Sequence, residues 1–249
     1  MKKIEPLSGV PLYIEVCFND LKLANATGFL VKNGISCFLI SNWHVFSGRH
    51  PDTGLSVDKD LAIPNKIKVH HHKKGYLGQF VIREYFLSNE EEKPLYIEKR
   101  LSNTSMIDVA ALEIKIESEI DYQFLDLKLS TTDILLYPSD SVSIIGFPDG
   151  VSVEGFPVWK TGHIASDLDL DYCQKPAFLI DATTKSGMSG SPVIAQRVGG
   201  HPTSNGFNLA GGAQKFLGIY SGRVSDKNLS DLVSVGLVWK LSTILDLIL

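Results

Sequence analysis

The 249-residue chain has only three cysteines, no long apolar run and no strong excess of one charge. The cysteines, Cys17, Cys37 and Cys173, are an odd number at wide spacing, so the sequence predicts neither a disulfide framework nor a metal site. We expect them to be small buried hydrophobic residues. Glu5, Pro6, Glu15 and Asp20 interrupt any apolar stretch near the N-terminus, and no apolar run reaches about 18 residues. We therefore expect neither a secretory signal nor a membrane-spanning helix. These absences favour a soluble, cytoplasmic protein in a reducing compartment.

The distribution of charge along the chain argues against two classes of partner, nucleic acid and membrane surfaces. The 28 acidic and 24 basic residues are spread along the chain and give a formal net charge of −4. No broad basic field is therefore available to attract nucleic acid or an anionic membrane surface. The sequence also contains no pattern that calls for a cofactor, so we expect none. The 44% of hydrophobic residues suffices for a sizeable core.

Apolar residues instead recur with a period of two. Leu12, Ile14, Val16 and Phe18 alternate with more polar neighbours, as expected for a half-buried strand. The step Asn33-Gly34 predicts a tight hairpin between two such segments. Further short strands are predicted in KIKVH, GQFVIREYFL, DVAALEIKI, SVSIIGFP, VWKTGHIAS, AFLIDA, SPVIAQ, FLGIY and VGLVWK. Only the C-terminal KLSTILDLIL is typical of a helix, so the fold class is all-β, a sandwich or barrels.

The segment TTKSGMSGSPVI, residues 183–194, interrupts this strand pattern with glycines and hydroxyl side chains. A serine hydroxyl becomes a nucleophile only beside a base, usually a histidine oriented by a carboxylate. Gly-x-Ser also supplies two backbone N–H groups, from Gly187 and Ser189, that can stabilise an oxyanion. The interruption is therefore interpreted as a nucleophile loop between two strands, with Ser189 as the nucleophile.

This chemistry is completed by two residues that lie much earlier in the chain. His44 follows the apolar strand CFLIS, and Asp108 begins the apolar strand DVAAL. A carboxylate buried there needs a partner, because desolvating a lone charge is costly. The chain order His, Asp, Ser is that of the chymotrypsin lineage of catalytic triads.

These motifs together resemble a known family. The segments ATGFLVKNGISCFLISNWHVF, DVAAL, GFP at residues 146–148, GMSGSPV, GIYSG and VGLVW occur in the order found in trypsin-like (chymotrypsin-fold) serine peptidases. The chain is most similar to their disulfide-poor bacterial branch, which includes HtrA-like and glutamyl-endopeptidase-like enzymes. The resemblance implies one peptidase domain over residues 1–249, made of two six-stranded antiparallel β-barrels at about 1–120 and 121–249, with a closing C-terminal helix.

The resemblance also implies roles for individual residues. Ser189 would attack the scissile carbonyl of a protein or peptide substrate, His44 would transfer the proton and Asp108 would orient the imidazole. Ser221 matches a serine that contacts the triad carboxylate. The stretch Ser221, Gly222 and Arg223 would pair with the substrate backbone as an added strand.

Departures from the family pattern bear on activation and specificity. Met188 stands where relatives activated by N-terminal cleavage carry an aspartate, so that route of activation is not expected. Thr183, at the wall of the primary pocket, replaces the aspartate of trypsin. Thr184 matches a threonine of glutamyl endopeptidases, but Tyr220 replaces their carboxylate-binding histidine. We expect an uncharged or small residue before the cut, with an acidic residue as the alternative favoured by Arg223 and Thr184.

Several alternatives remain open at this stage. His44 or Asp108 taken alone is more typical of a structural residue, and Ser191 is a rival nucleophile that lacks the Gly-x-Ser-Gly register. Residues 70–72, three consecutive histidines, suggest a metal site only if they lie in a loop, because neighbours on a strand face opposite ways. We expect an exposed loop there without metal. A non-catalytic binding module, or a latent peptidase activated by a separate regulatory protein, are the alternative functions.

Overall fold

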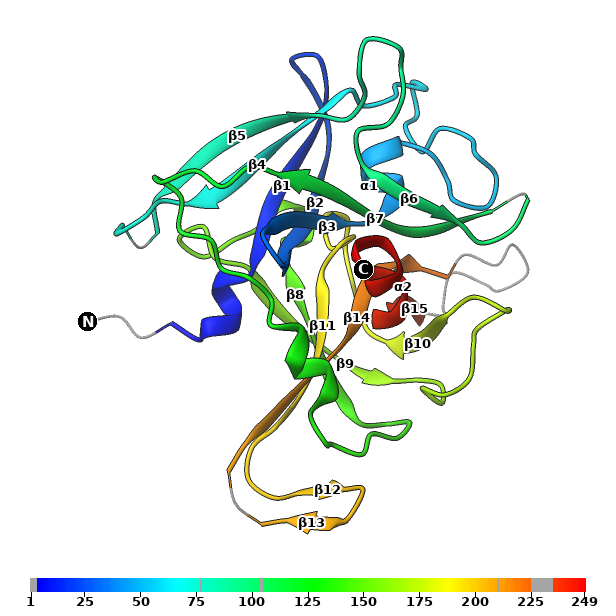
Figure 1. Cartoon of the computed structure of the whole chain (residues 1–249). Helices are drawn as coiled ribbons and strands as arrows, with labels where there is room; N and C mark the ends of the chain where they lie inside the picture. The colour runs from blue at the N-terminus through cyan, green and yellow to red at the C-terminus, as the bar shows by residue number, and fades with distance from the viewer. Residues whose placement is uncertain (1–3, 77, 104, 210, 225–234) are drawn as a thin grey trace.

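The computed structural model describes residues 4–76, 78–103, 105–209, 211–224 and 235–249. The main elements are two β-sheets, one above the other in Figure 1. The upper sheet has seven antiparallel strands in the order β5-β4-β1-β2-β3-β7-β6. Its strands are β1 (Pro11–Phe18), β2 (Leu21–Asn33), β3 (Ser36–Ser41), β4 (Lys66–His72), β5 (Phe80–Phe86), β6 (Ile97–Arg100) and β7 (Met106–Ile114).

The lower sheet is a closed six-stranded barrel in the order β10-β15-β14-β11-β8-β9. Its strands are β8 (Ser141–Gly146), β9 (Val158–Ile164), β10 (Ala177–Asp181), β11 (Pro192–Arg197), β14 (Ala213–Arg223) and β15 (Val235–Lys240). A short hairpin, β12 (His201–Thr203) and β13 (Gly206–Asn208), projects from its lower end (Figure 1). The helical elements are α1 (Trp43–Ser47), α2 (Leu241–Ile248), η1 (Pro6–Gly9), η2 (Leu127–Thr131) and η3 (Pro148–Gly150).

This architecture confirms an all-β, chymotrypsin-like fold with a C-terminal helix. Alternation explains most of β1: Leu12, Ile14 and Val16 are buried, as their period of two predicts. Phe18, expected on the same face, is instead exposed, because the register shifts between Val16 and Cys17. The predicted hairpin is also present, with Asn33 paired to Ser36 across a two-residue turn. The upper unit differs from the expected six-stranded barrel, because its described strands form a seven-stranded sheet rather than a closed barrel. The additional strand, the exposed β6, pairs with β7 at the edge of this sheet.

One apolar core joins the two sheets. Phe29 of β2 and Phe216 of β14 are buried, and their ring centroids lie 5.8 Å apart. Trp239 of β15 and Ile244 of α2 belong to the same buried cluster. The cluster therefore fixes the two sheets against each other, which is what a site shared between them requires.

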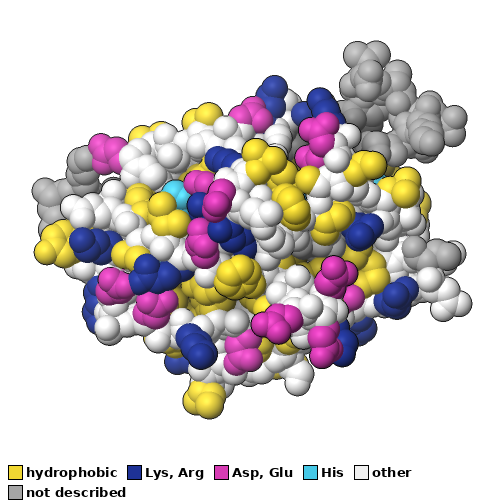
Figure 2. Space-filling view, turned by 90° about the horizontal axis from the view of Figure 1, so that it is seen from above, with side chains coloured by type: hydrophobic (Ala, Val, Ile, Leu, Met, Phe, Trp, Pro, Cys, Tyr) yellow, Lys and Arg dark blue, Asp and Glu magenta, His cyan; other side chains and the backbone are white. Residues whose placement is uncertain are grey.

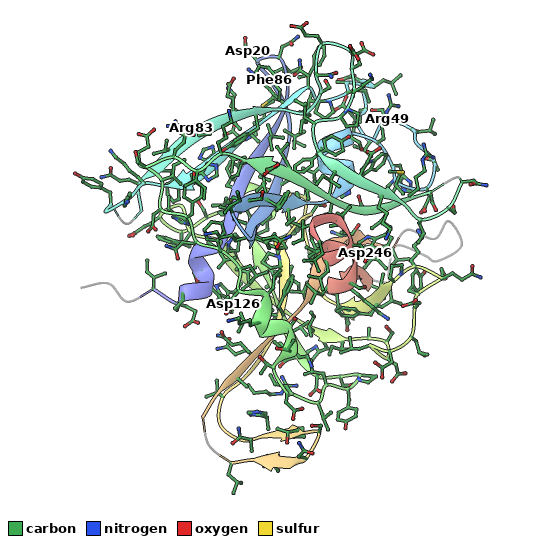
Figure 3. The ribbon with its side chains drawn as sticks, in the orientation of Figure 1. Asp20, Arg49, Arg83, Phe86, Asp126 and Asp246 are labelled. Carbon is green, nitrogen blue, oxygen red and sulfur yellow. The ribbon has the colours of Figure 1, made fainter. Side chains whose placement is uncertain are left out.

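Polar contacts stabilise the helical elements at the surface of the molecule. Asp126 accepts a hydrogen bond from the backbone N–H of Lys128 and so caps η2, and Asp246 of α2 forms an ion pair with Lys99 (Figure 3). Acidic and basic side chains are interspersed with apolar ones over the face seen in Figure 2. None of the helices among the described residues is long and apolar enough to cross a membrane.

Two sequence-based expectations were wrong. The histidines at residues 70–72 lie on strand β4 rather than in an exposed loop, and His71 is only 1% exposed because it faces the core of the upper sheet. The cysteines were expected to be buried, which holds for Cys17 and Cys37 but not for Cys173, an exposed residue with a positive φ of 50°. Neither hydrophobicity nor spacing distinguishes a turn cysteine from a core cysteine.

Candidate active site

His44 lies in the first turn of α1, directly after strand β3. Trp43, Val45 and Phe46 on the same short helix are buried and hold it against the upper sheet. Gly48 ends the helix in the left-handed conformation, at φ 65°, and its N–H donates to the carbonyl of His44. The apolar run and the glycine together place the imidazole at the rim of the sheet.

Asp108 lies on β7 and is 1% exposed. Its Oδ1 accepts the backbone N–H of His44 at 2.8 Å, and its Oδ2 lies 2.8 Å from His44 Nδ1. The hydroxyl of Ser221 donates to the same Oδ2. Asn42 adds a bond from Nδ2 to the backbone carbonyl of Asp108 at 2.7 Å. These donors compensate the cost of burying the carboxylate.

The pKa of His44 reflects two opposing influences. Burial, the larger single influence, lowers it, but the charge of Asp108 and the hydrogen bond to Asp108 together outweigh burial and raise the pKa above its ordinary value. Because a carboxylate only accepts hydrogen bonds, the proton of the neutral ring belongs on Nδ1 and Nε2 is left as an acceptor. With 22% of its side chain exposed, His44 presents that acceptor to the cleft.

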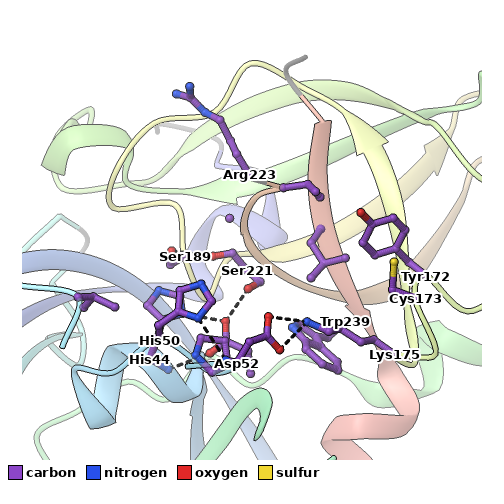
Figure 4. A pocket seen from close by; sticks show the side chains of 16 residues that line it. His44, His50, Asp52, Tyr172, Cys173, Lys175, Ser189, Ser221, Arg223 and Trp239 are labelled. Carbon is purple, nitrogen blue, oxygen red and sulfur yellow. Dashed lines mark hydrogen bonds and ion pairs between the residues drawn. The ribbon is translucent and has the colours of Figure 1, made fainter. Parts of the chain in front are cut away.

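Ser189 lies in the loop between β10 and β11 and opens into the same cleft as His44 (Figure 4). Its Oγ donates to the backbone carbonyl of Ser221 at 2.9 Å. Within the described part of the chain, no hydrogen bond joins this hydroxyl to His44. The expected contact between nucleophile and base is therefore not formed in this structure, although rotation about the Cα–Cβ bond of Ser189 would redirect the hydroxyl.

The backbone around Gly187 has a defined direction. Gly187 has φ 86°, and a Cβ there would lie 2.3 Å from the carbonyl oxygen of Phe147, so only glycine fits. The N–H of Asp149 donates to the carbonyl of Ser186 at 2.6 Å. In a planar trans peptide the N–H points away from the C=O, so the N–H of Gly187 points away from Asp149. Among the described residues it has no hydrogen-bond acceptor.

The peptide between Met188 and Ser189 repeats this arrangement. The carbonyl of Met188 accepts the N–H of Ser191 at 3.0 Å, which turns the N–H of Ser189 the other way, again without an acceptor in the described residues. Met188 is fully buried in the core of the lower barrel and anchors the loop. Ser191, the rival nucleophile, is also fully buried and does not line the cleft.

The cleft that contains His44 and Ser189 has a volume of about 850 Å³. Lys175 Nζ bridges both carboxylate oxygens of Asp52 at 2.8 Å across its wall (Figure 4). The sequence analysis missed several lining residues, including His50, Asp52, Tyr172, Cys173 and Lys175. They come from two loops more than a hundred residues apart, and no spacing rule joins such loops.

The residues expected to bind substrate fall into two groups. Ser221, Gly222 and Arg223, on the edge of β14, line the cleft beside Ser189. Thr184 and Tyr220 are instead buried beneath it, and their hydroxyls form a hydrogen bond with each other.

Two further side chains lie near this buried pair. Arg223 Nη2 donates to the carbonyl of Thr184 at 2.7 Å and so lies over the pair. Thr183 is exposed on the loop.

Metal ligation has no support in the described ranges, where no three His, Cys, Asp or Glu side chains gather around a common point. The histidines of residues 70–72 have other partners. His70 Nε2 lies 3.0 Å from Glu15 Oε1, and His71 Nε2 lies 2.9 Å from the hydroxyl of Tyr85. Alternation along β4 sends these two rings to opposite faces of the sheet.

A solved structure shares the fold at low sequence identity. A serine endoprotease from Yersinia pestis matches with a TM-score of 0.54 and 13% identity over 99% of this chain and 66% of that chain. The Rv3671c protease in an inactive form matches with a TM-score of 0.47 and 17% identity, over 96% of this chain and 87% of that chain. A search of curated proteins by sequence found no match.

A family-level comparison is decisive. The sequence profile of the trypsin-like peptidase domain matches residues 26–199, which include His44, Asp108 and Ser189. The matched range begins on β2 of the upper sheet and ends after β11 of the lower barrel, so it spans both units. The chain belongs to the family of trypsin-like peptidase domains.

Proposed function

We propose that this chain is a serine endopeptidase that hydrolyses peptide bonds through an acyl-enzyme. The observation that carries the proposal is the pairing of His44 Nδ1 with the buried carboxylate of Asp108 at 2.8 Å, in the cleft that also contains Ser189. Pairing of this kind leaves Nε2 free to accept a proton. Ser189 alone of the two candidate serines reaches the cleft.

In the proposed reaction, the hydroxyl of Ser189 leaves the carbonyl of Ser221 and turns toward His44 Nε2. The oxygen attacks the scissile carbonyl carbon while the imidazole takes the proton, and the imidazolium returns that proton to the leaving amine. Asp108 stabilises the imidazolium and keeps its tautomer. A water molecule, deprotonated by His44, then cleaves the acyl ester and restores Ser189.

The oxyanion would be stabilised by the N–H groups of Gly187 and Ser189. Both lack an acceptor within the described residues, and their direction is set by bonds to the neighbouring carbonyls. One such donor is typically worth about 3 to 4 kcal/mol in the transition state. The geometry of Gly187 is therefore as important to this proposal as the hydroxyl of Ser189.

For specificity we infer a small or uncharged residue before the cut. The support is the buried pair of Thr184 and Tyr220, whose hydroxyls satisfy each other and fill space beneath the cleft. An acidic residue is the alternative, favoured by the guanidinium of Arg223 on the adjacent strand edge. Cleavage of a peptide library by the wild-type protein, read by mass spectrometry, separates the two.

A latent peptidase is the second candidate. The observation that favours it is the hydrogen bond from Ser189 to Ser221, which withholds the nucleophile from His44. In this case a regulatory partner protein would change the resting state. A partner-dependent enzyme would cleave the peptide library only after addition of that partner, whereas a constitutive enzyme would need none.

The decisive experiment is labelling with a fluorophosphonate probe, which reacts with an activated serine. We expect the wild-type protein to be labelled and Ser189→Ala to be unlabelled. Ser191→Ala is the matched control, since that hydroxyl is buried two residues away and should not affect labelling. A folded wild-type protein that stays unlabelled and cleaves no peptide would favour the non-catalytic binding module instead.

A further inference from the structure

Thr27 lies on β2 of the upper sheet but contacts the nucleophile loop of the lower barrel. Its side chain is fully buried, and its backbone pairs with Tyr13 of β1. Residues 27 and 187 are 160 positions apart in the chain. Contacts of Thr27 with the loop are therefore contacts between the two sheets.

All the polar atoms of Thr27 are used around this loop. Its Oγ1 donates to the carbonyl of Gly187 at 2.8 Å and accepts the N–H of Phe147 at 3.2 Å. Its backbone N–H donates to the carbonyl of Ser189 at 2.9 Å. Its own carbonyl accepts the hydroxyl of Ser41 at 2.8 Å. The side-chain hydroxyl thus links two backbone groups that would otherwise be buried without partners.

Two hydrogen bonds hold the peptides on either side of Gly187, and one of them comes from Thr27. The peptide before it is held by Asp149, whose N–H donates to the carbonyl of Ser186. The peptide after it is held by the hydroxyl of Thr27. Glycine is the most permissive residue in the backbone, so the loop sequence alone does not select one conformation at this position. The selection comes from contacts outside the loop.

We propose that Thr27 is a positioning residue that holds the oxyanion donor of Gly187 in its productive direction. The proposal rests on the proposed peptidase function. Without the hydroxyl, the carbonyl of Gly187 and the N–H of Phe147 lose a shared partner inside the protein. Buried groups without partners are unfavourable, and the peptide after Gly187 rotates to find another one.

The test compares three variants. Thr27→Val keeps the shape and removes the hydroxyl, while Thr27→Ser keeps the hydroxyl and removes the methyl group. Both retain the backbone bond to Ser189, so the side chain alone is tested. Thr243→Val is the matched control, because Thr243 is also 1% exposed and its hydroxyl donates to a backbone carbonyl, that of Lys240, in the C-terminal helix.

We expect Thr27→Val to lower kcat about 10- to 100-fold with KM nearly unchanged, because an oxyanion donor acts in the transition state. Thr27→Ser should recover most of this loss, and Thr243→Val should retain wild-type kcat even if its Tm falls equally. Thr27→Val with wild-type kcat, or Thr27→Ser as impaired as Thr27→Val, would overturn the proposal.

A second readout does not depend on activity. Crystal structures of the wild type and of Thr27→Val should show the carbonyl of Gly187 turned away from its present position in the variant alone. An unchanged Gly187 in that variant contradicts a positioning role for Thr27, whether or not the wild type is a peptidase. A wild type inert to the probe, with Gly187 displaced in the variant, contradicts only the peptidase function.

Discussion

The proposed base, His44, and the proposed nucleophile, Ser189, are held in contrasting ways. Asp108 fixes His44 through the ring and through the backbone, and Ser221 donates to the same carboxylate. The hydroxyl of Ser189 has one hydrogen bond, to a backbone carbonyl of the lower barrel. The base side, which is His44 with Asp108, is therefore assembled in the resting protein. The nucleophile side, which is the loop around Ser189, has a fixed backbone, but its hydroxyl is not bonded to His44.

This difference follows from the chemistry of the two side chains. An imidazole paired with a buried carboxylate has few alternatives, because any other orientation would remove one of the three donors to the buried charge of Asp108. A serine hydroxyl has three staggered rotamers and changes among them quickly. Preorganisation is therefore needed for His44 and for the backbone around Ser189, whereas the hydroxyl itself can be recruited when substrate binds.

The largest effect should come from breaking the base side. Asp108→Asn is expected to lower kcat about 10⁴-fold, because an amide holds the wrong tautomer of His44 and does not stabilise the imidazolium. Asp246→Asn is the control, since Asp246 forms an exposed ion pair with Lys99 on the C-terminal helix. Steady-state kinetics on a cleaved peptide would measure both. Retention of more than a tenth of wild-type kcat in Asp108→Asn would contradict the assigned role.

Breaking the backbone of the nucleophile side should have the next largest effect. Gly187→Ala places a methyl group 2.3 Å from the carbonyl of Phe147, at φ 86°, and is expected to lower kcat about 10²- to 10³-fold. Gly34→Ala separates the two causes, since Gly34 also has positive φ, 57°, but open space around it. An equal loss of kcat in both variants would attribute the effect to general instability.

A second histidine, His71, has a shifted pKa that makes the stability of the protein depend on pH. Burial, with the nearby charge of Arg83, lowers the pKa of His71 to about 4 from 6.5. Below pH 6.5 the unfolded chain binds the extra proton, so stability present above pH 6.5 is lost as pH falls toward 4, by about 3 kcal/mol in total. His71→Gln should reduce this dependence, as measured by urea unfolding at pH 7 and pH 4.5.

Two outcomes of that measurement are informative. His72, whose pKa burial also lowers, should preserve a remaining slope in the variant. An unchanged pH dependence of unfolding in His71→Gln would mean that His71 is protonated in the folded protein. Activity measured on His71→Gln then reports the titration of His44 with less interference from unfolding.

The smallest loss of activity is expected at Ser221, which forms hydrogen bonds with both Asp108 and Ser189. Ser221→Ala removes the hydroxyl bonded to Asp108 but keeps the carbonyl bonded to Ser189. We expect kcat/KM to fall about 10-fold, the equivalent of one lost hydrogen bond of about 1.4 kcal/mol.

The pH profile of kcat/KM gives a second test of the bond between Ser221 and Asp108. Its acid limb should follow His44, whose pKa lies above the ordinary 6.5. In Ser221→Ala the carboxylate of Asp108 has one donor fewer and attracts the imidazolium more strongly. The limb should therefore move to higher pH in the variant, and movement to lower pH would contradict this electrostatic account.

Much of the fold was predictable, for reasons visible in particular segments. Alternation over residues 12–16 of β1 and the buried run of β7 identified strands, and the glycine after Asn33 identified a hairpin. The strand β6 was not identified, because its residues, Ile97–Arg100, are all exposed and carry no apolar period. Edge strands of this type are specified by backbone pairing, which leaves little trace in side-chain patterns.

The candidate site was predictable to a similar depth. The order and local pattern of His44, Asp108 and Ser189 sufficed to propose a triad. The resting orientation of the Ser189 hydroxyl was not accessible, because it depends on a carbonyl 32 residues away. Thr27 was missed for the same reason, since its hydroxyl reaches a partner 160 residues away in a different sheet.

The burial of Met188 has a further consequence for how the loop responds to its surroundings. An apolar anchor is strengthened by strongly hydrated anions such as sulfate and weakened by cooling, whereas an ion pair at the same position would be screened by salt. Because Met188 is fully buried beside the nucleophile, the turnover of this protein should tolerate high ionic strength. Its sensitivity should instead appear in the cold, where the anchor loses its driving force.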